Sequence, residues 1–220
     1  MRHYIVRVSL SCAFLLVCAA TLLAQTTVPT GYNPVEYHRI ELGTAKSLTA
    51  RFQSVNATPV ISSVAGDISA ATVVRLLMTP RAVYLRQYFA LDDNGVLHLL
   101  LVPKTADNHD IILSRITDAN GTTISEKQAR AWIKNYKTSA LFARHGNAYS
   151  SSTHTDAVRA VITRNNAASV RFYFANDDTG RMTTVLSGVT AQSIESTVYI
   201  ADKSCCPPDV ELGAGELAQP

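Results

Sequence analysis

The sequence predicts an α+β protein made of two tandem helix–helix–strand–strand repeats that form a shared antiparallel sheet with the helices packed on one face. Three observations support this fold: an internal repeat, a hairpin pattern in each copy, and two helical patterns before each hairpin. Leu85–Asp107 aligns with Val170–Gln192 without a gap, and ten of the 23 positions are identical. Because a lone hairpin is marginal in water, we expect the two units to share a core about a pseudo-twofold axis. Two separate domains on a linker are the alternative.

The domain boundaries follow from this repeat. We expect a signal peptide over 1–24, an N-terminal extension over 25–39, a first repeat over 40–112, a joint over 113–123, a second repeat over 124–200, and a flexible Cys- and Pro-containing tail over 201–220. Turn-forming residues in the joint fit this division.

Residues 1–24 have the composition of a secretory signal peptide. Arg2 and Arg7 flank the start of an apolar run that ends near the small residue Ala24, and no acidic residue occurs before Glu36. The apolar run is shorter than the roughly 20 residues that a spanning helix needs. We therefore expect cleavage after Ala24 and export to the periplasm or the medium. A retained membrane anchor and a lipoprotein modified at Cys12 or Cys18 are the alternatives.

Cleavage would remove the basic excess of the chain. The whole chain has 20 Lys and Arg residues against 17 Asp and Glu, and the loss of Arg2 and Arg7 leaves 18 against 17. A nearly neutral mature protein has no electrostatic preference for nucleic acid. We therefore expect no nucleic-acid partner. We also expect no membrane span after cleavage, because no later stretch is apolar enough to cross a bilayer.

Two helical patterns precede each hairpin. In the second copy, Ser125 and Gln128 form a capping box, and apolar residues follow at helical spacing: Ala129, Trp132, Ile133, Tyr136 and Ala140. In the first copy, the equivalent apolar stripe is Ala45, Leu48, Phe52 and Val55. A second, shorter helix is predicted near Ile68–Met78 and again near Thr155–Thr163.

Each hairpin has an acidic turn that ends in glycine. A type I turn with Gly95 in the left-handed conformation would pair Phe89 with Leu99, whereas a two-residue Asn-Gly turn would pair Phe89 with Leu100. The first register places apolar residues on one face of the hairpin, where Gln87 is the one polar exception. The apolar residues are Leu85, Phe89, Leu91, Leu97, Leu99 and Leu101. A slip of one residue would expose that face, so burial favours the first register. The second copy keeps the glycine as Gly180 and has its own apolar face, with Asn176 and Thr184 as exceptions.

The opposite face of the sheet carries the candidate binding residues Arg86, Tyr88, Arg171 and Tyr173. A repeated Arg-x-Tyr pair would bind an acidic or glycan ligand through charge-assisted hydrogen bonds and ring stacking. The alternative is an ordinary solvated cross-strand pair. In the first copy this face also holds apolar residues, which indicates a covering segment or a partner surface.

Other chemistry has weaker support. The Asp residues of both turns lack the spacing of a calcium loop, and no histidine has the spacing of a metal ligand, so we expect no metal and no cofactor. His109 or His154 would join a remote serine in a hydrolase, but Ser150–Ser152 has the pattern of a loop before a helix. The basic stripe of Lys127, Arg130, Lys134 and Lys137 is typical of a solvated face, with an anionic lipid or glycan contact as the alternative.

Cys205 and Cys206 are adjacent, and a disulfide between neighbours is strained. In an exported protein they would form that strained ring, an intermolecular bridge or a free thiol pair. An oligomer would form through these cysteines or through the open sheet face.

The repeated Tyr-Phe-Ala…Asp-Asp-x-Gly hairpin, the helix pairs, the leader and the late Cys-Pro-Pro resemble small exported proteins of Gram-negative bacteria, a group of uncharacterised proteins with a duplicated helix–helix–hairpin unit. The resemblance implies export and an α+β unit. Since that group has no assigned activity, it supplies no catalytic residues.

These observations favour an exported, non-enzymatic binding or structural module whose ligand is unknown. The alternative is an exported hydrolase with its site at the interface of the two repeats. If residues 1–24 are retained, the protein would instead be a membrane-anchored accessory protein.

Overall fold

A computed structural model describes residues 32–56, 61–112, 116–164 and 166–201. The predicted signal peptide, most of the N-terminal extension before Tyr32, and the tail with Cys205 and Cys206 lie outside the described residues. From Pro34 onward the described residues belong to one compact unit, so they are not divided into two domains.

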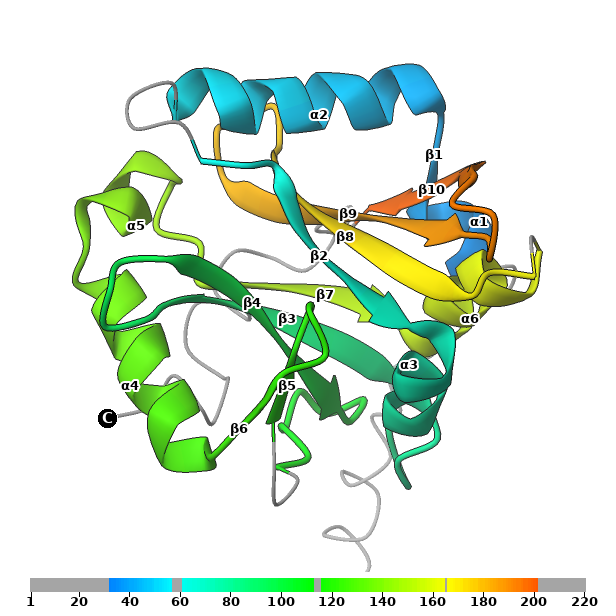
Figure 1. Ribbon diagram of the computed structural model, residues 1–220, viewed down its shortest axis with the longest axis horizontal. Coiled ribbons are helices and arrows are strands. Elements are labelled where there is room, and N and C mark those ends of the chain that lie inside the picture. Colours follow the sequence, from blue (N-terminus) through cyan, green and yellow to red (C-terminus); the bar gives the residue numbers. More distant parts are fainter. Residues whose placement is uncertain (1–31, 57–60, 113–115, 165, 202–220) are drawn as a thin grey trace, which may run out of the picture. The chain divides into compact units, whose positions relative to one another are not determined.

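The strands form two antiparallel sheets (Figure 1). The sheet named here the β3 sheet has the order β6-β5-β4-β3-β7, with β3 (Tyr84–Leu91), β4 (Leu97–Lys104), β5 (Ile116–Asp118), β6 (Thr123–Ile124) and β7 (Ser150–His154). The β8 sheet has the order β1-β10-β9-β8-β2, with β1 (Arg39–Ile40), β2 (Val64–Ser69), β8 (Ser169–Asn176), β9 (Met182–Val189) and β10 (Glu195–Ala201).

The helices connect these strands. In chain order they are α1 (Pro34–His38), α2 (Leu42–Val55), α3 (Ala70–Leu77), α4 (Glu126–Lys137), α5 (Ala140–Arg144) and α6 (Thr155–Thr163). As predicted, Ser125 caps α4, because its hydroxyl accepts from the backbone N–H of Gln128 at 3.2 Å. Within the described residues, no helix is long and apolar enough to cross a membrane.

The α+β class is therefore confirmed, but the prediction of one shared sheet is wrong. The apolar faces of the two hairpins bury each other, and side chains from both sheets enter one hydrophobic cluster. Phe89 of β3 and Phe174 of β8 lie 6.4 Å apart between ring centroids inside it. Two sheets that each carry an apolar row on one face can form a core without a helix layer between them.

Each sheet also takes its edge strand from the other half of the chain. β2 comes before the β3–β4 hairpin but pairs with β8, and β7 comes before the β8–β9 hairpin but pairs with β3. Neither strand was predicted. β2 covers the start of the helix predicted over Ile68–Met78, and β7 replaces the loop predicted at Ser150–Ser152.

The predicted hairpin register is confirmed. Phe89 pairs with Leu99 and Leu91 with Leu97, while Gly95 adopts a φ of 78°. The second hairpin repeats this turn, with Gly180 at a φ of 83°. In each turn the first Asp side chain accepts backbone N–H groups, from Asn94 and Val96 in the first and from Thr179 and Arg181 in the second. These acidic residues therefore shape the turns.

Two of the three polar exceptions on the inner faces, Gln87 and Thr184, bond to each other, whereas Asn176 lies 3.0 Å from His145 Nδ1. Thr184 of β9 donates to Gln87 Oε1 at 3.3 Å, and its hydroxyl lies 3.1 Å from the hydroxyl of Ser151 on β7. The amide of Gln87 also donates to the Leu85 carbonyl at 2.7 Å. These bonds join the two sheets inside the core, where an unpaired polar group would be costly.

The helices do not lie on one face, which corrects a further part of the prediction. Figure 1 shows α2 across the outer face of the β8 sheet, where Ala45 and Leu48 pack on Ala175 and Val185. α4 contacts β3, and its Tyr136 ring lies 6.0 Å from Phe89. α3 and α6 directly follow the exchanged strands β2 and β7 and contact each other. The β8 sheet therefore has a helix-covered outer face, on which the candidate site lies.

Candidate functional site

The structure separates the four predicted binding residues into two sets. In the β3 sheet, Arg86 and Tyr88 are fully buried. Arg86 Nη1 donates to Asp110 at 2.7 Å, and the Tyr88 hydroxyl donates to the other carboxylate oxygen of Asp110 at 2.5 Å. Arg86 also donates to the side chain of Asn108. Arg86, Tyr88 and Asp110 are named here the closed set. Protein groups already occupy the positions in which a ligand would contact these side chains.

In the β8 sheet, the corresponding side chains are partly exposed. Both Nε and Nη2 of Arg171 donate to the two carboxylate oxygens of Asp67 at 2.7 Å. The Tyr173 hydroxyl lies 2.7 Å from each carboxylate oxygen of Glu195, and Arg171 Nη1 lies 3.6 Å from the same carboxylate. The side chains of Arg171 and Glu195 are 28% and 25% exposed. Arg171, Tyr173 and Glu195 are named here the open set.

The acid in each set was missed by the sequence analysis. Asp110 and Glu195 are separated by the same 85 residues as the two Arg and the two Tyr residues. They lie beyond the aligned segment, and one is Asp while the other is Glu, so residue identity gave no signal. Continuing the 85-residue offset past the last identical position would have found them.

Arg86 and Arg171 have different bonding partners because the residues that pair with them on the neighbouring strands differ. Asp67 of β2 pairs directly with Arg171 and binds it through both carboxylate oxygens. The equivalent partner of Arg86 on β7 is Ser152, whose hydroxyl accepts from the Lys104 amine at 3.0 Å. Ser152 supplies no carboxylate, and Arg86 bonds instead to Asp110 and Asn108 on the segment that follows β4.

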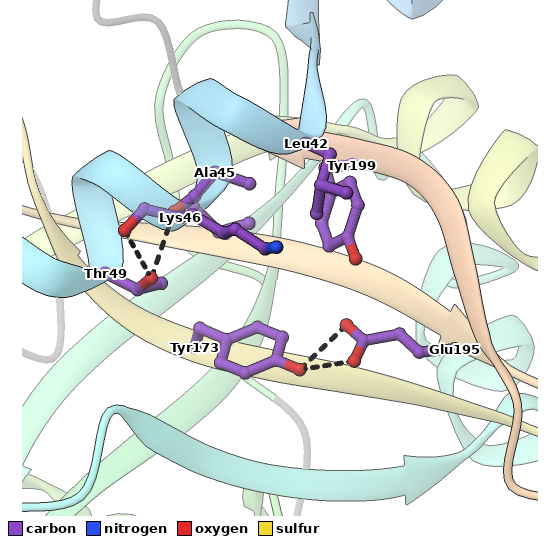
Figure 2. Close-up of a pocket in the computed structure, with 8 residues that line it drawn as sticks. Leu42, Ala45, Lys46, Thr49, Tyr173, Glu195 and Tyr199 are labelled. Atoms are coloured by element: carbon purple, nitrogen blue, oxygen red, sulfur yellow. Dashed lines mark hydrogen bonds between the residues drawn. The ribbon is translucent and has the colours of Figure 1, made fainter.

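The open set borders a pocket between α2 and the β8 sheet (Figure 2). Its volume is about 160 Å³. The lining residues come from one helix and three strands: Leu42, Ala45, Lys46, Thr49, Tyr173, Val185, Glu195 and Tyr199. α2 therefore forms one wall, and the outer face of the sheet forms the other.

Several polar groups face this pocket. Figure 2 shows the Lys46 amine, the Tyr199 hydroxyl and the Glu195 carboxylate around one space. Among the described residues, Lys46 has no ion-pair partner and the Tyr199 hydroxyl has no hydrogen-bond partner. Thr49 is held in place because its hydroxyl lies 3.0 Å from the Ala45 carbonyl and 3.1 Å from the Lys46 carbonyl. Donors and an acceptor are thus available to a ligand.

Burial and Glu195 extend the pH range over which the two tyrosines are protonated beyond that of an ordinary tyrosine. Burial and then the hydrogen bond to Glu195 raise the pKa of Tyr173 well above its usual range. Burial, with Glu195 as a second cause, also raises the pKa of Tyr199. Both phenols therefore remain hydrogen-bond donors at neutral pH.

The histidines that a hydrolase would need lie elsewhere. His98 lies between Asp92 and Asp118, at 3.5 Å from each, and stacks on Trp132. His154 caps α6 by accepting from the backbone N–H of Asp156 at 3.2 Å. His109 lies 3.8 Å from Asp107, and none of these three histidines lines the pocket.

The other candidate features stay apart from the pocket. On α4, Lys127 and Lys134 are exposed, while Arg130 pairs with Glu126 at 2.8 Å. No group of three metal-ligating side chains occurs within the described ranges.

Comparisons with known protein families, with curated proteins and with solved structures found no match.

Proposed function

We propose that this protein is an exported, non-enzymatic binding module and that its ligand occupies the pocket between α2 and the β8 sheet. The observation that carries the proposal is the contrast between two equivalent Arg–Tyr–acid sets. The side chains of the closed set are buried and Asn108 accepts from Arg86, whereas the open set borders a pocket. A convergent pocket with few polar groups is the usual form of a small-ligand site.

A duplicated unit accounts for this contrast. If both sets arose from one ancestral unit, one copy retained a structural role and the other was left open to a ligand. The shared 85-residue offset of the Arg, Tyr and acidic residues supports this proposal. The proposed site is therefore single: the second copy supplies its sheet wall, and α2 of the first copy supplies the other wall.

A thermal denaturation experiment with a pocket-filling variant tests the site. A ligand that binds only the folded state raises the unfolding free energy by about 2.7 kcal/mol at 100 times its Kd. We expect at least one compound from a set of neutral sugars, dicarboxylates and amino acids to raise the midpoint of the wild type. The Ala45→Leu variant, which fills the pocket, should lose this shift.

Ala131→Leu is the matched control, because it makes the same change at an exposed position of α4. It should keep the ligand-induced shift of the wild type. The proposed site is wrong if Ala45→Leu folds and retains the full shift, or if no compound shifts the wild type.

Export is a separate part of the proposal and rests on the composition of residues 1–24. The intact mass of the protein recovered from a secreting host tests it. A mature chain that begins at Gln25 supports export with cleavage. A full-length chain recovered with the membrane fraction would instead support the anchored alternative.

A further inference from the structure

We propose that the pocket binds one sugar ring, as a free neutral monosaccharide or as a unit of a glycan; this inference rests on the proposed function. The first support is size. A volume of about 160 Å³ is below the roughly 300–1,000 Å³ of sites for drug-sized ligands. The pocket therefore suits a ligand of one ring rather than an extended molecule.

Charge is the second support. The charges of the side chains in and beside the pocket cancel, because Lys46 and Arg171 are basic while Asp67 and Glu195 are acidic. An anion bound at Lys46 would lie near the Glu195 carboxylate, and a cation bound at Glu195 would lie near Lys46 and Arg171. A neutral ligand avoids both repulsions.

The third support is the division of the lining into an apolar part and a polar part. Leu42, Ala45 and Val185 supply apolar surface, and the Tyr199 ring supplies an aromatic one. Glu195, Lys46 and the Tyr199 hydroxyl supply an acceptor, a donor and a group that does both. A sugar ring presents C–H groups on its faces and hydroxyls around its rim, so it matches both parts.

Tyr173 acts as a positioning residue in this site. Its hydroxyl donates to Glu195 and fixes the carboxylate, while Arg171 lies 3.6 Å from the same group. A carboxylate has about four lone-pair sites, so it can accept sugar hydroxyls while it retains these contacts. A preformed acceptor loses little conformational entropy when the ligand binds.

The experiment measures binding by saturation-transfer NMR and calorimetry. The probes are glucose, galactose and N-acetylglucosamine, with succinate and alanine as an anionic and a zwitterionic comparator. We expect at least one sugar to bind the wild type, and its affinity to fall roughly tenfold or more in Glu195→Gln and in Tyr199→Ala. Tyr173→Phe should weaken binding less than Glu195→Gln does.

Two control variants separate binding effects from folding effects. Tyr88→Phe removes the same hydroxyl from the closed set, and Lys134→Met removes an exposed lysine from α4. Both should bind the sugar with wild-type affinity, whereas Lys46→Met should weaken it. Circular dichroism confirms that each variant is folded before its affinity is compared.

The outcomes distinguish the two proposals. If succinate or alanine binds, the sugars do not, and Lys46→Met or Glu195→Gln removes that binding, the pocket is a ligand site but the sugar assignment is wrong. If a sugar binds with an affinity that no pocket variant changes, or if no probe binds, both proposals are overturned.

Discussion

The two Arg residues of the repeat make similar contacts in different surroundings. Arg86 and its partner Asp110 are fully buried, whereas the side chains of Arg171 and Asp67 are 28% and 41% exposed. Breaking a buried ion pair leaves an uncompensated charge in the core, while an exposed pair contributes little. The same substitution should therefore have different costs in the two sheets.

We predict that Arg86→Ala lowers the free energy of unfolding by about 3–5 kcal/mol and that Arg171→Ala lowers it by roughly 1 kcal/mol or less. Urea denaturation of the two variants and the wild type measures both values. Arg171→Ala is the matched control for Arg86→Ala. Equal losses would contradict the assignment of a structural role to the closed set.

His98 gives the stability of the protein a defined pH dependence. The Asp118 carboxylate, 3.5 Å away, raises the pKa of His98 above the ordinary value of 6.5; burial opposes this rise and Asp92 adds to it. The folded state thus binds the proton more tightly than the unfolded state. This stabilisation is fully present below pH 6.5 and is lost as the pH rises through the folded-state pKa.

We predict that His98→Gln destabilises the protein more at about pH 5.5 than at about pH 8.5. Urea denaturation of the wild type and the variant at both pH values measures the difference. A loss that is equal at the two values, or larger at the alkaline one, would show that the charge on His98 does not stabilise the fold.

At the residue scale, the sequence singled out Arg171 and Tyr173 because both recur in the repeat. The structure places Tyr173 in the lining of the candidate pocket and Arg171 beside Glu195. Lys46 and Tyr199 carry no such signal. The position of Lys46 relative to Glu195 and Tyr199 of β10 depends on how α2 crosses the β8 sheet, which periodicity does not encode.

Among the elements, the exchanged strand β2 depends on one glycine. A Cβ atom on Gly66 would lie 2.5 Å from the Ala119 carbonyl oxygen and 2.5 Å from Asn120 Oδ1. The backbone oxygen cannot move without shifting the turn between β5 and β6. Close packing of β2 on that turn therefore requires the absence of a side chain at this position.

We predict that Gly66→Ala costs roughly 3 kcal/mol, because the overpacked strand must shift. Gly95→Ala should cost only about 1 kcal/mol, since its φ of 78° is strained for alanine but no atom lies near the added Cβ. Thermal and urea denaturation measure both losses. A smaller loss for Gly66→Ala than for Gly95→Ala would contradict the close approach of β2 to the turn.

At the element scale, the hairpins and most helices could be predicted, but β2 and β7 could not. The hairpins have apolar alternation and turn residues, which are local signals. β2 contains Gly66 and Asp67, and β7 is almost entirely Ser and Thr, so neither has a clear apolar face. Both strands form because a hairpin from the other half of the chain offers an edge.

Over the whole molecule, the exchange of β2 and β7 ties the two halves together. Neither sheet is complete without a strand from the other half, and one hydrophobic cluster joins both sheets. Two halves that share their sheets and their core should unfold together. Since one cluster joins both sheets, the predicted shared core is confirmed, whereas the predicted single shared sheet is wrong.

We predict a single unfolding transition in urea. Fluorescence of Trp132, the one tryptophan in the chain, and far-ultraviolet circular dichroism should give the same midpoint. Trp132 packs against the core from α4, whereas dichroism reports all the helices and strands. Two separated midpoints would show that the halves fold independently.

If the open set borders the ligand site and the closed set is structural, a ligand should change the surroundings of the open set alone. An NMR titration of protein with isotope-labelled tyrosine and valine measures this, with glucose, galactose and N-acetylglucosamine as probes. We predict that signals of Tyr173, Tyr199 and Val185 shift with at least one sugar, while those of Tyr88 and Val102 do not. Shifts confined to the β3 sheet would contradict the open set as the ligand site, and no shifts with any of the three would contradict the sugar assignment.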